Sequence, residues 1–318
     1  MSIIIPGTLK TPVLFLVFNR PDVTKRVFQA IREARPFQLF IAADGPRTEK
    51  SGEQNKCDAV RSIVKDVDWD CDVQTLFRDK NLGCGKAPAQ AISWFFDHVE
   101  EGIILEDDCL PNPAFFAFCS ELLERYRHDV RIMEIGVVNL IEDLCRQDEY
   151  SYFFSEHNHT WGWATWRRAW KLYDYKISSY KEKVIKDFLS TSFYTGLEYD
   201  YFKNIFDETY YNNNAISWWD YQWEFTRRIN GGLSIVSREN LIVNLGIGGN
   251  ATHTLDPHGL GAKMRFGNVS FPLKHPQIIL PNRKRDHEYF KKTFTTFQSK
   301  IKHTIKKTFL SLSLKKGW

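Results

Sequence analysis

The sequence predicts an α/β protein, a Rossmann-like, mostly parallel β-sheet flanked by helices, with a basic amphipathic helix at the carboxyl end. Over the first 130 residues or so, short apolar runs rich in β-forming residues alternate with segments of helical periodicity. Each apolar run stops at polar or turn residues, as strands do at a sheet edge. With 318 residues and 43% hydrophobic side chains, the chain can bury a substantial core.

The first two predicted strands are followed by polar residues. Residues 12–18 form a continuous apolar run, typical of a strand buried on both faces, which ends at Asn19 and Arg20. Asp22 can cap the helix that follows, in which apolar residues recur at helical spacing. Residues 37–43 predict a second strand that stops at Asp44, and residues 57–67 a second helix.

The alternation continues as strand 73–77, helix 87–98, strand 102–105 and helix 115–126. The strand at 102–105 runs directly into Glu106-Asp107-Asp108. Ligands of such sheets bind beyond the carboxyl ends of the strands. We therefore expect Arg20, Asp44 and the three acids to line one cleft.

After residue 131 the regular alternation is lost and the chain becomes aromatic and polar. We expect one catalytic domain over residues 1–281, with a donor half at about 1–130 and an acceptor half at about 131–281, and a tail at 282–318. Trp161-Gly162-Trp163 combines ring faces with a glycine and is a candidate platform for a sugar, although core packing explains it equally well. The segment 244–254 is Gly-rich and polar, which predicts a loop over the cleft.

Composition excludes several classes of protein. Residues 283–318 hold eleven Lys and Arg residues against two acids, so the rest of the chain is net acidic and gives no reason to expect nucleic-acid binding. The six cysteines have neither zinc-site spacing nor the density of a disulfide scaffold, which indicates reduced thiols in a cytosol. The sequence has neither a signal-peptide pattern nor an apolar run long enough to span a membrane.

Three consecutive carboxylates after a buried strand are costly unless a cation or hydrogen-bond donors compensate them. Mg²⁺ or Mn²⁺, bound by carboxylate and phosphate oxygens, would do so. The alternative is a solvated acidic turn.

The run from strand to acids to helix at residues 102–116 resembles the DxD region of GT-A glycosyltransferases, in the EDD form of an N-acetylglucosaminyltransferase family. The resemblance spans roughly residues 12–255, in which only the EDD block is specific by itself. Other matching segments occur in the same order: residues 12–20, Asp44, 81–83, 161–163 and 219–220.

The resemblance implies a GT-A fold, a nucleotide-sugar donor such as a UDP-sugar, and a bound Mn²⁺ or Mg²⁺. It makes Asp108 the metal ligand and Glu106 and Asp107 donor contacts. It also places Arg20 and Asp44 in the nucleotide pocket, where the alternatives are a surface salt bridge and a turn cap. Lys86 is a further candidate for a phosphate contact, although its segment lacks P-loop spacing.

Glycosyl transfer also needs a base for the acceptor hydroxyl. By resemblance Asp220 is that base, and Glu224, on the same helical face, is the alternative base; Asp220 could instead cap its helix. His253 is a candidate metal ligand, as a late His is in many GT-A enzymes, whereas a lone loop His is more often a solvent-facing residue.

The sequence thus favours an inverting glycosyltransferase. A sugar-phosphate nucleotidyltransferase would need a Gly-rich phosphate loop after the first strand, and residues 19–22 do not form one. A non-catalytic glycan-binding scaffold is the third class.

The basic tail carries apolar residues at intervals of three or four from Phe290 to Leu312, with lysines beside them. This pattern predicts a helix on an anionic membrane surface, and hence a cytoplasmic enzyme at the inner face of the membrane with a glycan or lipid-linked acceptor. The alternatives are a helix packed on the catalytic domain and a disordered extension.

Overall fold

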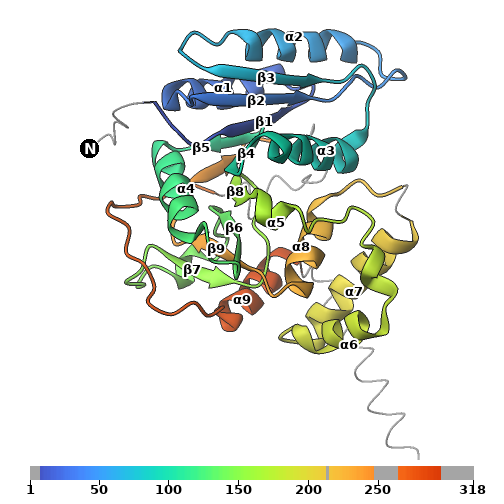
Figure 1. Cartoon of the computed structure of the whole chain (residues 1–318), viewed down its shortest axis with the longest axis vertical. Coiled ribbons are helices and arrows are strands. Elements are labelled where there is room, and N and C mark those ends of the chain that lie inside the picture. The colour runs from blue at the N-terminus through green and yellow to red at the C-terminus, as the bar shows by residue number, and fades with distance from the viewer. Residues whose placement is uncertain (1–7, 213–214, 247–263, 295–318) are drawn as a thin grey trace, which may run out of the picture.

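The computed structural model describes residues 8–212, 215–246 and 264–294. Within them lies an eight-stranded sheet of order β3-β2-β1-β4-β8-β6-β9-β7, with helices packed against it (Figure 1). The predicted α/β fold with a mostly parallel sheet is confirmed.

The first half of the sheet is parallel throughout. Its strands are β1 (Val13–Val17), β2 (Gln38–Ala43), β3 (Asp72–Phe77) and β4 (Glu101–Glu106). The helices between them are α1 (Pro21–Ala34), α2 (Glu53–Lys65) and α3 (Gly83–His98), and α4 (Pro113–Tyr126) follows β4. Alternate side chains of β1 enter two cores: Phe15 packs with α1 and α4, and Leu14 packs with α3. Because both of its faces are covered, β1 is apolar and buried at every position, as the sequence predicts, whereas the edge strand β3 keeps polar, exposed residues.

Local sequence sets the helix starts. Pro21 and Pro113 stand in the first turns of α1 and α4, where a missing N–H costs nothing. The Asn112 side chain caps α4 by accepting from the Phe115 N–H at 3.1 Å. The expected cap of α1 is wrong: Arg20 occupies the cap position without a side-chain cap, and Asp22 lies in the first turn.

The second half of the sheet is mixed. Strand β8 (Trp163–Trp166) runs antiparallel to β4 and joins the two halves, and β6 (Ile132–Gly136), β9 (Leu233–Ser237) and β7 (Tyr152–Ser155) follow it. The short helix α5 (Arg167–Trp170) comes directly after β8.

A helical layer stands beside this half (Figure 1). It contains α6 (Lys183–Ser192), α7 (Gly196–Tyr211) and α8 (Asp220–Ile229), and the 3₁₀ turn η2 (Ser178–Lys181) comes directly before α6. A first 3₁₀ turn, η1 (Glu142–Leu144), lies earlier in the chain, between β6 and β7. The aromatic side chains between residues 177 and 225 form its own core.

A second, two-stranded sheet was not predicted. Strand β5 (Cys109–Pro111) follows the three acids and pairs antiparallel with β10 (Ile242–Asn244). The pairing places Asn244, where the predicted Gly-rich loop begins, opposite Cys109, directly after the acids. The described start of the loop therefore lies beside the acids, as the sequence predicts.

The tail begins with α9 (Arg283–Phe294), which packs on the protein. Phe290 is fully buried, and the ring of Phe294 lies 5.1 Å from that of Tyr201 on α7. For these two residues the predicted membrane-facing stripe is wrong, because their rings already pack against the aromatic core of the helical layer. Residues 295–318 lie outside the described part of the chain. No helix in the described ranges is both long and apolar enough to cross a membrane.

Candidate active site

Arg20 and the acids meet at the carboxyl edge of the sheet. Strands β1 and β4 pair in register with Leu16 opposite Glu106, so the residues that follow each strand are neighbours. One terminal nitrogen of Arg20 lies 2.9 Å from Asp108 Oδ2, and the other donates to Asp107 Oδ1. The predicted convergence of these segments is therefore present in the structure.

The carboxylates outnumber the cations that compensate them. Burial, followed by the charges of Asp108 and Asp107, raises the pKa of Glu106 to about 8. Burial also raises the pKa of Asp107 to about 6, although Arg20 opposes the shift. Asp107 Oδ2 is buried without a hydrogen-bond partner. A cluster of this kind is stabilised by any ligand that brings a further cation or donor.

A divalent metal fits this edge only with help from a ligand. No group of three or more His, Cys, Asp or Glu side chains within the described ranges could hold a metal ion. Asp108 and the free oxygen of Asp107 can supply one or two ligands, and Mg²⁺ sites of this type take the others from water and substrate phosphates. His253, the other predicted ligand, lies outside the described residues.

Asp44 lies at the end of β2, as predicted, but its carboxylate is occupied by hydrogen bonds within the protein. Its two oxygens accept from the backbone N–H groups of Gly45, Leu82 and Gly83 and from the Asn81 side chain, at 2.9 to 3.1 Å. Burial raises its pKa and these donors oppose the shift. Asp44 thus braces the start of α3 against the β2 loop, which leaves little acceptor capacity for a nucleotide base.

Lys86 lies half-buried in the first turn of α3. This turn packs against the segment that leads into α8, because Cys84 Sγ lies 3.0 Å from the Ser217 carbonyl oxygen. A methyl group on Gly85 would come within 3.0 Å of the Trp218 carbonyl. The amino end of α3, a site of positive partial charge, therefore lies beside the approach to Asp220.

Asp220 is the first residue of α8. Its negative charge adds to the raised pKa of Glu106, after burial and the charges of the neighbouring acids, so the two carboxylates lie within electrostatic range. The Asn158 side chain donates to the Asp220 carbonyl oxygen at 3.0 Å and fixes the start of the helix. The candidate base therefore lies near the acid triplet, on the other half of the molecule.

Glu224, the alternative base, is fully buried. Its oxygens lie 2.9 Å from Arg227 Nη2 and 2.6 Å from Arg228 Nη2, and one of them accepts from the Asn158 N–H at 2.9 Å. Burial alone would raise the pKa of Glu224, but the two arginines and His157 hold it well below its usual range. A carboxylate fixed in this way is a poor proton acceptor, so Asp220 is the stronger candidate.

In the Trp161-Gly162-Trp163 segment, Gly162 and Trp163 belong to the packed interior. Trp163 is fully buried, and its ring stacks 5.7 Å from that of Trp219. Gly162 has φ +64, and a methyl group there would lie 2.6 Å from Ile242 Cδ1. Trp161 is half-buried against the main core. The expectation of a ring face offered to an acceptor is wrong for Trp163, because its ring is buried, and it stays a prediction for the partly exposed Trp161.

Gly246, which was not among the predicted site residues, lies against the acids. The Leu245 N–H donates to the Asp108 carbonyl oxygen at 2.7 Å, which holds this backbone against the acids. A methyl group on Gly246 would lie 2.1 Å from Asp108 Oδ2 and 2.7 Å from Arg20 Nη1. Only glycine leaves the ion pair intact, and the Gly-rich composition of residues 244–250 was the available signal.

A second missed group supports the loop that carries Arg20. Glu53, at the start of α2, accepts from the Asn19 side chain at 2.9 Å and pairs with Arg47 at 2.5 Å. The Arg47 pair holds the pKa of Glu53 at about 2. The ends of β1 and β2 are linked by this carboxylate.

No family model and no curated protein matches the chain. Among solved structures, the inositol-1-phosphate CTP transferase from T. maritima is 9% identical, with 72% of this chain and 85% of that chain covered and a TM-score of 0.34. HddC from Yersinia pseudotuberculosis is 12% identical, with 50% of this chain and 77% of that chain covered and a TM-score of 0.31. UDP-glucose pyrophosphorylase complexed with UDP-glucose is 14% identical, with 47% of this chain and 63% of that chain covered and a TM-score of 0.26. At these values no residue role carries over.

Proposed function

We propose that the protein is a metal-dependent glycosyltransferase that moves a sugar from a nucleotide-diphosphate donor, a UDP-sugar, to a glycan or lipid-linked acceptor. The observation that carries this proposal is the excess of carboxylate at the sheet edge, where Arg20 compensates three acids and Asp220 stands nearby. Such an edge suits a ligand that brings both a metal ion and phosphate oxygens.

In this proposal Asp108 and Arg20 act on the leaving diphosphate, and Asp220 acts on the acceptor hydroxyl. Asp108 would hold Mn²⁺ or Mg²⁺, which supplies positive charge to the departing diphosphate. Arg20 turns its guanidinium from the carboxylates towards the same phosphates, as its planar fork allows. Asp220 takes the proton of the acceptor hydroxyl, while the bond from that oxygen to the anomeric carbon forms and the bond to the diphosphate breaks. Attack from the face opposite the leaving group inverts the anomeric centre.

The second candidate is sugar-phosphate nucleotidyl transfer, the type of reaction named for the compared UDP-glucose pyrophosphorylase. A mostly parallel sheet with acids at its edge serves this reaction equally well. The connection from β1 to α1 is the observation that separates the two. It consists of Phe18, Asn19 and Arg20 alone, without a glycine, and α1 begins at Pro21. So short a connection offers few backbone N–H groups to a triphosphate, and it favours glycosyl transfer.

The two reactions have different products and can be assayed side by side. Full-length protein is incubated with a panel of nucleotide sugars with and without EDTA, and separately with nucleoside triphosphates and sugar 1-phosphates. We expect metal-dependent release of nucleoside diphosphate in the first assay. Release of pyrophosphate in the second assay alone would establish the nucleotidyltransferase, and inactivity in both would leave a glycan-binding scaffold.

Asp108→Ala should lower the metal-dependent rate more than roughly tenfold without lowering the melting temperature, because Arg20 keeps its pair with Asp107 and the loss of one acid relieves repulsion among the three. Asp97→Ala, which removes an exposed acid of α3, is the matched control. Activity of Asp108→Ala close to that of the control at saturating Mn²⁺ would remove Asp108 as a metal ligand.

A further inference from the structure

A short segment between β7 and β8 is held by buried acids from three other elements. The backbone N–H groups of residues 156–159 each donate to a side-chain oxygen. In order along the segment, the acceptors are Asp286 of α9 at 2.9 Å, Ser155 at 3.0 Å, Glu224 of α8 at 2.9 Å and Glu134 of β6 at 2.6 Å. All four acceptor side chains are buried. Because a buried carboxylate is costly without donors, the segment and the three acids fix one another.

Helix α9, the first part of the predicted tail, anchors this segment. Asp286 uses both of its oxygens there, since the second one accepts from the Ser155 hydroxyl at 2.6 Å. The rings of Tyr289 and His159 lie 4.4 Å apart. The conformation of the segment is therefore set by the fold rather than by a ligand, as is expected of residues that support a site.

Asn158 connects the segment to the start of α8. Its backbone N–H donates to Glu224, and its side-chain amide donates to the Asp220 carbonyl oxygen at 3.0 Å. The amino end of α8 has few other restraints, because Trp219 stands at the cap position and makes no side-chain cap hydrogen bond. The Tyr173 hydroxyl holds the preceding carbonyl, that of Trp219, at 3.0 Å. The bond from Asn158 is thus the one that acts on the residue that carries the candidate base.

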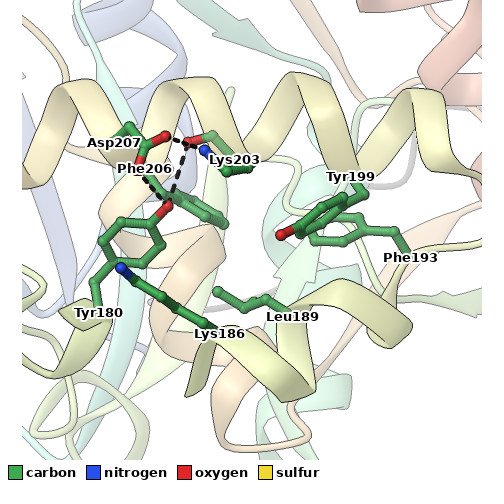
Figure 2. Close-up of a pocket in the computed structure, with 8 residues that line it drawn as sticks. All are labelled: Tyr180, Lys186, Leu189, Phe193, Tyr199, Lys203, Phe206 and Asp207. Atoms are coloured by element: carbon green, nitrogen blue, oxygen red, sulfur yellow. Dashed lines mark hydrogen bonds and ion pairs between the residues drawn. The ribbon is translucent and has the colours of Figure 1, made fainter. Parts of the chain in front are cut away.

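The rest of α8 is held by different contacts. The rings of Tyr180 and Phe206, two of the side chains drawn in Figure 2, lie 6.0 Å and 5.3 Å from that of Phe225 on α8. The Trp223 indole N–H donates to Glu134 at 2.7 Å. Loss of the Asn158 amide should therefore loosen the first turn of α8 and leave the body of the helix in place.

We propose that Asn158 is a positioning residue for the acceptor side of the reaction, which aims the Asp220 carboxylate by holding the carbonyl group of the same residue. The assignment rests on the proposed function, in which Asp220 takes the proton of the acceptor hydroxyl. A misplacement of about 1 Å can cost on the order of 10²-fold in rate, so one hydrogen bond to the backbone of the base is enough to matter. Because Asn158 contacts α8, its loss should act on the rate of transfer rather than on donor binding.

Asn158→Ala tests this in the full-length protein, since it removes the amide and keeps the backbone N–H that donates to Glu224. We expect kcat for transfer to fall about tenfold while the Kd of the donor changes less than about twofold. Asn230→Ala is the matched control. The Asn230 amide donates to the Thr226 carbonyl oxygen at 2.7 Å, at the other end of the same helix, so this variant loses the same kind of bond and should keep the wild-type kcat.

Hydrogen–deuterium exchange of the same variants without substrate gives a second measurement that needs no activity. The Trp223 N–H, which donates to the Trp219 carbonyl oxygen at 3.3 Å, reports on the first turn of α8. Its exchange should be about tenfold faster in Asn158→Ala, as loss of one hydrogen bond allows, and unchanged in Asn230→Ala.

Three results would overturn the proposal. These are equal exchange of the first turn of α8 in wild type and Asn158→Ala, equal kcat of Asn158→Ala and Asn230→Ala, or a fall in donor affinity without a fall in rate. If the wild-type protein is inactive, the proposed function fails, and faster exchange still establishes that Asn158 fixes the backbone of Asp220.

Discussion

Two clusters of arginine and carboxylate, one in each half of the molecule, are built from the same residue types and behave in opposite ways. The edge cluster consists of Arg20 with Glu106, Asp107 and Asp108, at the ends of β1 and β4. The interior cluster consists of Glu224 with Arg227 and Arg228 on α8, together with Glu134 on β6.

Charge balance and exposure separate the two clusters. In the interior cluster two arginines face two glutamates, and all four side chains are buried. In the edge cluster one arginine, with 29% of its side chain exposed, faces three acids. The pKa of Glu224 is held down by its partners, although burial raises that of Glu134 against the opposing charge of Arg227. At the edge, burial and neighbouring acids raise the pKa of Glu106 to about 8. A balanced cluster holds the fold together, and an unbalanced one is completed by a ligand.

The largest effect should come from the interior cluster. Glu224→Ala leaves two buried arginines without their common partner, and breaking a buried pair in this way costs about 3–5 kcal/mol of unfolding free energy. Urea unfolding of the variant measures it, with Glu208→Ala, an exposed acid of α7, as the control. If the loss were below about 1 kcal/mol, the distinction drawn between the clusters would not hold.

Asp220→Asn should show the reverse pattern, with stability retained and chemistry lost. We expect the transfer rate to fall by roughly 10² to 10⁴, because the amide cannot accept the proton, and donor affinity to change little. Single-turnover rates and donor titrations separate the two quantities. A collapse of donor affinity with a normal rate on bound donor would assign Asp220 to the donor pocket, and a retained anomeric configuration in the product would remove its role as base.

The smallest effect concerns Glu53, whose partner Arg47 is largely exposed. Because the folded-state pKa of Glu53, about 2, lies below its ordinary value of 4.5, ionised Glu53 stabilises the fold above pH 4.5. This contribution is lost as the pH falls from 4.5 towards 2. The difference in unfolding free energy between wild type and Glu53→Gln should therefore shrink over that window. Glu33→Gln, an exposed acid of α1, should show no such change, and a constant difference for Glu53→Gln would contradict the ion-pair account.

The sequence predicted the first half of the fold well, because each of its elements is a local pattern. The apolar run at 12–18 can only be a strand buried on both faces, and the rule that ligands bind at strand ends brought Arg20 to the acids without any knowledge of register. The pairing of β5 with β10 was beyond reach, since strands of three residues leave no periodic signal.

Most errors in the site came from side chains whose surroundings are set by distant segments. Glu224 and the arginines after it look in sequence like the solvated face of a helix, but α8 is buried because α6 and α7 pack on it and Arg227 lies against Glu134 of β6. Trp163 looked like a sugar platform because nothing local shows that Trp219 and Trp223 stack on it.

The antiparallel contact of β8 with β4 bears on how the chain reaches this fold. During synthesis the amino-terminal half emerges first, and its four parallel strands can pair among themselves. Until residues 163–166 follow, however, β4 is an apolar edge strand with one unpaired row of backbone groups, the kind of edge that recruits other chains. The four parallel strands are thus closed on this side by β8, and a fragment cut near residue 130 should self-associate rather than stay monomeric.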